Sequence, residues 1–246
     1  MPSIITGKRA TARALAICAF AAGLALAATA RAQSCDAVQG AAARQRGDLA
    51  RIVDCLNAPG CPAEIAQEDP GAACRKTVHV WSRSAAGVVI RDLKMCFTPG
   101  VANDAGFLHG LAMPRSPVAG VEDDRLYAGD AGLDALWQFA WDAALARGMT
   151  SAEAMLVVNP PRNRSQNRLH IHIVRANGAP LPPTVELPDL ANVWRAAAEQ
   201  AAARGIPCRD YGIVVHMSEG RFRMLVEAAD PDPGVNPEGK YTLERR

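Results

Sequence analysis

The alternation of apolar and polar positions along the chain predicts a single domain that mixes strands with helices. Short apolar runs bounded by turn residues are typical of strands, and two such runs separated by a few small residues indicate a hairpin. The predicted strands cover 107–114 and 154–159, and the predicted hairpins cover 77–93 and 211–229. Because a hairpin lies near each end of this pattern, we expect an α+β fold, an antiparallel sheet with packed helices, and not a doubly wound parallel sheet.

Apolar residues at helical spacing mark three further segments, 34–57, 129–148 and 189–205. In the middle segment, Asp130 is a candidate N-cap and Gly148 a stop signal. Its predicted apolar face comprises Leu133, Leu136, Trp137, Ala140, Trp141 and Leu145. The stretch 230–239, rich in Pro and Gly, is predicted to be a loop.

The first 32 residues have the features of an export signal. Three basic residues precede an apolar run over 14–30, and Ala30 and Ala32 form a small-residue cleavage pattern. We favour cleavage, which predicts a signal peptide over 1–32, one domain over 33–246 and an exported, periplasmic protein. The alternative is an uncleaved anchor in the inner membrane, because the apolar run is only slightly short for a membrane span.

Export also decides how the cysteines are interpreted. The cysteines after the signal are Cys35, Cys55, Cys61, Cys74, Cys96 and Cys208. An even number in an oxidising compartment indicates disulfides, and we expect the four before Thr77 to pair among themselves. No C-x-x-C pair is present, so a zinc site is not expected. The formal charge of +2 gives no indication of a nucleic acid partner.

Two histidines one residue apart, His170 and His172, follow an arginine-rich loop. Because strand side chains alternate, the odd-numbered residues from Leu169 to Ile173 are predicted to face the core, while Arg168 shares the opposite face with the two histidines. A neutral imidazole is a good nucleophile toward phosphorus, and arginines can neutralise the oxygens of the transition state. The candidates for phosphate contact are Arg162, Arg164, Ser165 and Arg168.

Plainer explanations of the same residues stay open. Histidines at this spacing can ligate a metal, although no acidic residue or cysteine lies within several positions to complete such a site. Solvated histidines and an ordinary charged loop are further alternatives. His109, at the start of the strand predicted over 107–114, either lies near a nucleotide pocket or is a structural residue of the sheet, and we assign no function to His79 and His216.

Three longer stretches of the sequence resemble segments of a known protein family. The strings "HGLAMPRSPVAGVED", "VVNPPRNRSQNRLHIHI" and "YGIVVHMSEGRFRMLVEAAD" resemble, in this order, segments of the bacterial CDP-diacylglycerol pyrophosphatase family. Within the second string, "RSQNRLHIHI" resembles the active-site segment of the histidine-triad (HIT-like) superfamily. The similarity extends over most of the chain after about Cys55, and it implies a HIT-like α+β fold.

The resemblance also implies roles for single residues. His170 corresponds to the central histidine of the triad, the nucleophile, and His172 to the last one, which holds the phosphate and assists the leaving oxygen. Arg168 stands at the position of the first histidine, where an arginine can still contact phosphate. Asn159 lies where the superfamily commonly has an amide side chain, suited to phosphate or ribose contact or to capping the loop.

The implied activity is hydrolysis of CDP-diacylglycerol to CMP and phosphatidate, with no required metal and no cofactor. The implied partners are this nucleotide-lipid and a membrane surface, and the sequence predicts no oligomeric state. A nucleotidyl transferase on the same fold is one alternative. A noncatalytic nucleotide- or lipid-binding protein is another, because the first triad histidine is replaced.

Cleavage after Ala32 is testable directly. N-terminal sequencing of the exported protein is expected to begin at Gln33, because the small residues at 30 and 32 match the cleavage pattern. A product that still begins near Met1 and fractionates with membranes would show that the segment is an anchor.

Overall fold

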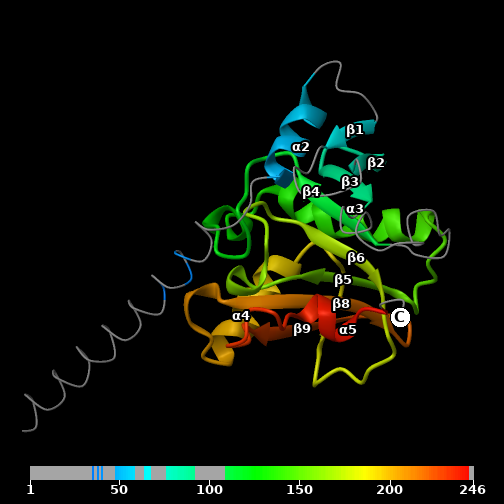
Figure 1. Cartoon of the computed structure of the whole chain (residues 1–246). Helices are drawn as coiled ribbons and strands as arrows, with labels where there is room; N and C mark the ends of the chain where they lie inside the picture. Colours follow the sequence, from blue (N-terminus) through cyan, green and yellow to red (C-terminus); the bar gives the residue numbers. More distant parts are fainter. Residues whose placement is uncertain are drawn as a thin grey trace, which may run out of the picture.

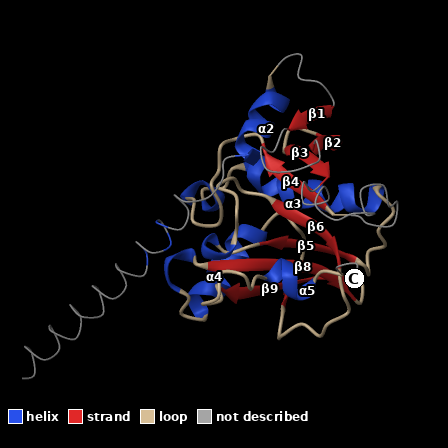
Figure 2. Ribbon diagram, in the orientation of Figure 1, coloured by secondary structure: helices blue, strands red, loops and turns tan. Residues whose placement is uncertain are grey.

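The structure is a computed structural model of the chain, and it describes residues 35, 38, 40, 48–58, 64–67, 76–91 and 109–243, with the backbone alone at 48, 64–67 and 76–79. Its main element is a nine-stranded antiparallel sheet with helices on both faces (Figure 2). This confirms the predicted α+β class. The predicted signal segment lies outside the described residues.

The strands are β1 Glu64–Gln67, β2 Lys76–Arg83, β3 Gly87–Arg91, β4 Gly110–Pro114, β5 Ala154–Val158, β6 Ile171–Arg175, β7 Val185–Leu187, β8 Tyr211–Ser218 and β9 Arg221–Ala228. The helices are α2 Asp48–Asn57, α3 Ala131–Ala146, α4 Val193–Ala203 and α5 Pro237–Tyr241, with short 3-10 turns at Asp124–Tyr127, Pro161–Asn163 and Pro207–Arg209. In space the strands run β1-β2-β3-β4-β6-β5-β8-β9-β7. β6 therefore lies between β4 and β5 at the middle of the sheet.

One face of the sheet packs against α3 and α4 and forms the largest core. Leu169, Ile171 and Ile173 point into it, as predicted. The rings of Trp137 on α3 and Trp194 on α4 lie 4.9 Å apart, and the Trp194 indole donates to a backbone carbonyl of α3. Buried aromatic side chains of this size dominate core energetics, so this pair fastens the two helices to each other.

The opposite face carries two smaller apolar clusters with a gap between them. At one end, residues of α2 pack on β3 and β4. At the other end, Tyr241 of α5 packs on β5, β6, β8 and β9. Figure 1 shows this arrangement, with α2 beside β3 and α5 against β5 and β8. The even-numbered residues at the start of β6 face the space between the two clusters.

Both predicted hairpins are confirmed, as β2–β3 and β8–β9. The second turns at Glu219 and Gly220, which both have positive φ, and glycine adopts this conformation without steric cost. The helix cap is also confirmed, because Asp130 accepts hydrogen bonds from the backbone N–H groups of Gly132 and Leu133.

Three predictions of local structure were wrong. Leu145 is 40% exposed, because 3.6 residues per turn bring Ala144 rather than Leu145 onto the buried face after Trp141. The helix predicted from 189 begins only at Val193. The stretch predicted as loop over 230–239 runs into α5, which begins with Pro237 after the N-cap Asn236.

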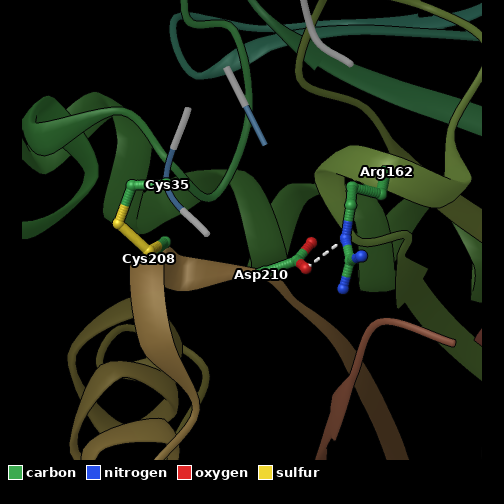
Figure 3. The surroundings of a disulfide bond; sticks show 4 residues. All are labelled: Cys35, Arg162, Cys208 and Asp210. Carbon is green, nitrogen blue, oxygen red and sulfur yellow. Dashed lines mark hydrogen bonds and ion pairs between the residues drawn. A yellow bond between two sulfur atoms is a disulfide. The ribbon is translucent and has the colours of Figure 1, made fainter. Parts of the chain in front are cut away.

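The predicted local pairing of the first four cysteines is wrong for Cys35. It forms a disulfide with Cys208, which lies 173 positions away in the 3-10 turn that precedes β8 (Figure 3). Cys55 is disulfide-bonded as well. Sequence spacing does not determine cysteine connectivity, because the partner is chosen by which segments the fold brings together.

No helix within the described part of the chain is long and apolar enough to cross a membrane. The apolar run over 14–30 is not among these residues.

Removing the Cys35–Cys208 bridge should destabilise the protein. The bridge closes a loop of 173 positions, so replacing both cysteines with serine is expected to lower the free energy of unfolding by about 2–5 kcal/mol. Denaturant unfolding of the double variant and the oxidised wild type measures this. Recovery of both cysteines as freely alkylatable thiols in the native wild type would contradict the bridge.

Candidate active site

His172 lies at the centre of the sheet face that α2 and α5 cover from its two ends. It is the second residue of β6, where it pairs with Leu111 of β4 and Val157 of β5. These two neighbours belong to the apolar clusters under α2 and α5 respectively. The imidazole is buried between them, and a buried polar group requires hydrogen-bond partners.

Three buried side chains supply those partners. The Nδ1 atom of His172 lies 3.2 Å from Nε2 of His109, and its Nε2 atom lies 3.2 Å from Nδ2 of Asn159 and 3.3 Å from Oε2 of Glu238. The other carboxylate oxygen, Oε1 of Glu238, lies 3.5 Å from Nε2 of His109. We refer to His109, Asn159, His172 and Glu238 as the histidine–glutamate cluster.

Asn159 fixes the geometry of this cluster. Its Oδ1 accepts a hydrogen bond of 3.2 Å from the backbone N–H of Glu238, and its Nδ2 donates one of 2.8 Å to Oε2 of the same residue. Because the backbone N–H can only donate, these contacts decide which end of the amide is the oxygen. Asn159, predicted to contact ligand or to cap the loop, therefore ties the end of β5 to α5.

His170 lies beside the cluster, just before β6 begins. Its ring packs edge-on against that of His172, with centroids 4.7 Å apart and an interplanar angle of 69°. Its Nδ1 atom lies 2.7 Å from the backbone carbonyl of Arg168. Since a carbonyl only accepts, Nδ1 carries the proton, and a neutral imidazole in this tautomer has its lone pair on Nε2.

The side chain of Arg168 donates to backbone carbonyls. Its Nη2 donates to the carbonyls of Pro114 and Arg115 at the end of β4, at 3.2 and 3.0 Å. Its Nε is buried without a hydrogen-bond partner, and burial lowers the pKa of the guanidinium. The predicted contact of Arg168 with phosphate stays a prediction, whereas its contact with the β4 end is part of the fold.

The loop arginines are paired with carboxylates. Arg164 is almost completely buried and forms a bidentate ion pair with Glu122. Its Nε also donates to the backbone carbonyl of Gln166. Arg162 pairs with Asp210, two residues after the bridged Cys208 (Figure 3). Burial raises the pKa of Asp210, and the guanidinium of Arg162 counters that shift.

These ion pairs shape the loop between β5 and β6. Ser165, between the two paired arginines and His170, is exposed. The predicted phosphate contacts of Arg162, Arg164 and Ser165 therefore stay predictions.

Helix α5 places Glu238 in the cluster, and contacts with neighbouring strands hold this C-terminal segment in position. Lys240 forms an ion pair with Glu227 of β9, and the backbone N–H of Leu243 donates to the carbonyl of Arg175 at the end of β6. Gly212 of β8 allows a close approach, because a Cβ there would lie 2.8 Å from Cγ of Pro237. The carboxylate position thus depends on contacts with three strands.

The cluster has a donor set that can hold a metal ion. One ligand atom from each of His109, His172 and Glu238 lies within 4.8 Å of the others, and all three residues are buried. Two imidazoles and a carboxylate are a ligand set that zinc accepts. No acidic residue lies near His170 and His172 in the sequence. The carboxylate comes instead from helix α5, which is distant along the chain.

A cavity lies elsewhere on the molecule, beside the disulfide. Its lining residues are Cys35, Val38, Glu122, Cys208 and Arg209. None of these residues belongs to the histidine–glutamate cluster. The lining therefore lacks the imidazoles and the buried amide that the cluster combines with a carboxylate. We therefore locate the candidate active site at the cluster and His170.

A comparison with protein families finds a match that includes part of this site. Residues 101–177 match the family model of CDP-diacylglycerol pyrophosphatase. The matched segment contains His109, Asn159, His170 and His172, and it includes the first two of the three strings that resemble the family. The resemblance is thereby confirmed over this segment, which is shorter than the similarity expected from the sequence. No curated protein matches the chain.

Glu238 is the residue of the site that sequence reasoning missed. It lies outside the matched segment, in a stretch whose Pro and Gly content predicted a loop. The only local signal was the Asn-Pro-Glu order of 236–238, which is typical of a helix start. Nothing in that order indicates that the helix lies against two histidines.

The structural contacts of Arg168 lead to a testable expectation. Replacing Arg168 with Ala should lower the free energy of unfolding by about 1–3 kcal/mol, because two carbonyls at the end of β4 lose a charged donor. Urea unfolding measures this loss. Unchanged stability together with a raised KM would instead show that Arg168 serves the substrate alone.

Proposed function

We propose that the protein hydrolyses CDP-diacylglycerol to CMP and phosphatidate, with His170 as the nucleophile. The observation that carries this proposal is the contact between Nδ1 of His170 and the carbonyl of Arg168, in a segment that matches the family. This contact orients the lone pair on Nε2 of His170. The neighbouring imidazole of His172 is a group that can hold and release a proton.

In the first step, Nε2 of His170 attacks the phosphorus that bears the cytidine. A nitrogen–phosphorus bond forms, and the bond from this phosphorus to the bridging oxygen breaks with both its electrons on the oxygen. That oxygen leaves as part of phosphatidate and takes a proton from the imidazole pair of His172 and His109. The cytidylyl group remains on His170 as a phosphoramidate.

In the second step, water attacks the same phosphorus from the side that the leaving group vacated. His172, now short of one proton, accepts the proton of the water, and the nitrogen–phosphorus bond breaks. CMP leaves, His170 regains its lone pair, and the starting protonation is restored. The sum is one CDP-diacylglycerol and one water converted to CMP and phosphatidate.

The location of the substrate is part of the proposal. CDP-diacylglycerol carries two acyl chains, so the enzyme is proposed to act at a membrane surface, as an exported, periplasmic protein. The near-neutral charge of the chain favours no strong electrostatic attachment to that surface. Transfer of the cytidylyl group to an acceptor other than water would need only a different second step.

Replacing His170 with Ala should reduce the release of CMP from CDP-diacylglycerol on the order of a thousandfold or more, because no other group then forms the covalent intermediate. Rapid quenching of the wild type with substrate labelled in the cytidine should trap the label on His170. His216→Ala is the matched control, since this half-buried histidine of β8 pairs with Met155, away from the cluster.

Near-normal CMP release by the His170 variant would sink the assignment of the nucleophile. Label that appears on an added alcohol rather than in free CMP would identify a transferase. Binding of the substrate without any turnover by the wild type would identify a noncatalytic binding protein.

A further inference from the structure

We propose that Arg164 is a positioning residue of the active site, which acts through the path of the loop between β5 and β6 and not through contact with the substrate. This inference rests on the proposed function, because the group that Arg164 positions is the imidazole of His170. It gives Arg164 a different task from the phosphate contact that the sequence predicts. The partner of Arg164 in this task is Glu122, to which the sequence assigned no role.

The first support is the burial of the ion pair. The side chain of Arg164 is 3% exposed and that of Glu122 is 19% exposed. The guanidinium binds the carboxylate in a bidentate manner, with Nη1 2.9 Å from Oε2 and Nη2 in contact with Oε1. A guanidinium keeps its charge, so its burial requires a partner that compensates this charge. Two parallel contacts also fix the direction of the side chain.

The second support is the place of the pair between two adjoining segments. The segment 114–122, which follows β4, is in contact with the segment 164–169, which leads to His170. The contacts include those of Arg168 with the carbonyls of Pro114 and Arg115, the hydrogen bond of 2.9 Å from the backbone N–H of Leu169 to the carbonyl of Val118, and the ion pair of Arg164 with Glu122. The ion pair thus fastens the end of this run that lies farthest from His170 along the chain.

Arg164 also connects the ion pair with the backbone of its own loop. Its Nε donates to the carbonyl of Gln166 at 3.1 Å, and Oε1 of Gln166 accepts a hydrogen bond of 3.4 Å from the backbone N–H of Leu49 in α2. The loop continues to Arg168, whose carbonyl lies 2.7 Å from Nδ1 of His170. A shift of the loop at Arg164 is therefore passed on to the contact that orients the nucleophile.

The third support is that residues outside the loop keep Glu122 in place and leave room for its partner. Nη1 of Arg209 donates to the backbone carbonyl of Glu122 at 3.2 Å, and Arg209 follows the bridged Cys208. At Gly120, a Cβ would lie 2.6 Å from Oε2 of Glu122 and would overlap Nη1 of Arg164. The ion pair is thus held from outside the loop, as expected for a group that orients another one.

Loss of the ion pair should slow the chemical step more than it weakens the binding of substrate. The loop would keep its contacts through Arg168 and Leu169, so His170 would stay in the site with a less defined orientation. A displacement of about 1 Å from the productive geometry can cost on the order of a hundredfold in rate. An arginine that binds phosphate equally in the ground state and the transition state would raise KM instead.

The test measures the release of CMP from CDP-diacylglycerol by Arg164→Lys, by Glu122→Gln and by the double variant. Lysine keeps the charge but cannot form the bidentate contact, and glutamine removes the charge of the partner. We expect each single variant to lose roughly ten- to a hundredfold in kcat, with KM changed less than about twofold. The double variant should lose no more than the larger single loss, because both substitutions remove the same interaction.

A readout of orientation accompanies these constants. The kcat is expressed per folded molecule, with the folded fraction taken from urea unfolding, so that a loss of stability alone leaves it unchanged. Rapid quenching with substrate labelled in the cytidine should show a slower appearance of the label on His170. Glu122→Asp keeps the charge with a shorter reach and should recover part of the lost kcat. If Arg164→Lys does not fold, Glu122→Gln alone decides, because it changes the more exposed partner.

Asp124→Asn is the matched control. It also removes one carboxylate from this segment, but its side chain is 92% exposed and pairs with Arg209. Because exposed ion pairs contribute little, this variant should leave kcat and KM unchanged.

Two results would overturn the inference. The first is a wild-type kcat per folded molecule in Glu122→Gln. The second is a raised KM at unchanged kcat in Arg164→Lys together with a lowered KM in Glu122→Gln, which would show that Arg164 binds phosphate and that Glu122 competes for it. The failure of the proposed function looks different, because His170→Ala would then retain hydrolysis whatever the ion-pair variants do.

Discussion

The burial of a polar cluster in the middle of one sheet face is the constraint on which the rest of this structure depends. Two imidazoles, an amide and a carboxylate lie where neighbouring strands carry apolar residues. Such groups are tolerated only when each finds partners, and here they find them in one another. The order β4-β6-β5 brings His109, His172 and Asn159 together, and α5 closes the group with Glu238.

The elements around the cluster can be understood from this requirement. Helix α2 and the C-terminal segment cover the sheet on either side of it, so the histidines lie between two dry clusters. Low local polarity strengthens every electrostatic contact inside and makes an unpaired charge expensive. The carboxylate of Glu238 therefore needs the directed contacts that Asn159 and the two histidines provide.

The loop between β5 and β6 supports both the fold and the proposed chemistry. Its arginines look like phosphate ligands, yet Arg162 and Arg164 are paired with Asp210 and Glu122, and Arg168 holds the end of β4. Those contacts determine the path of the loop, and the path delivers the Arg168 carbonyl to His170. The loop thus contributes orientation, and the proposed chemistry belongs to the imidazoles.

The sequence by itself determined much of the local structure and indicated every residue of the candidate site except Glu238. Alternation predicted both hairpins and the direction of Leu169, Ile171 and Ile173, because side-chain period follows from backbone geometry alone. The spacing of His170 and His172 indicated one polar surface. Tertiary structure alone decided that Glu238 joins His109 and His172, and that Cys35 pairs with Cys208, because contacts between distant segments depend on how strands order in the sheet and how helices cover it, which no local pattern encodes.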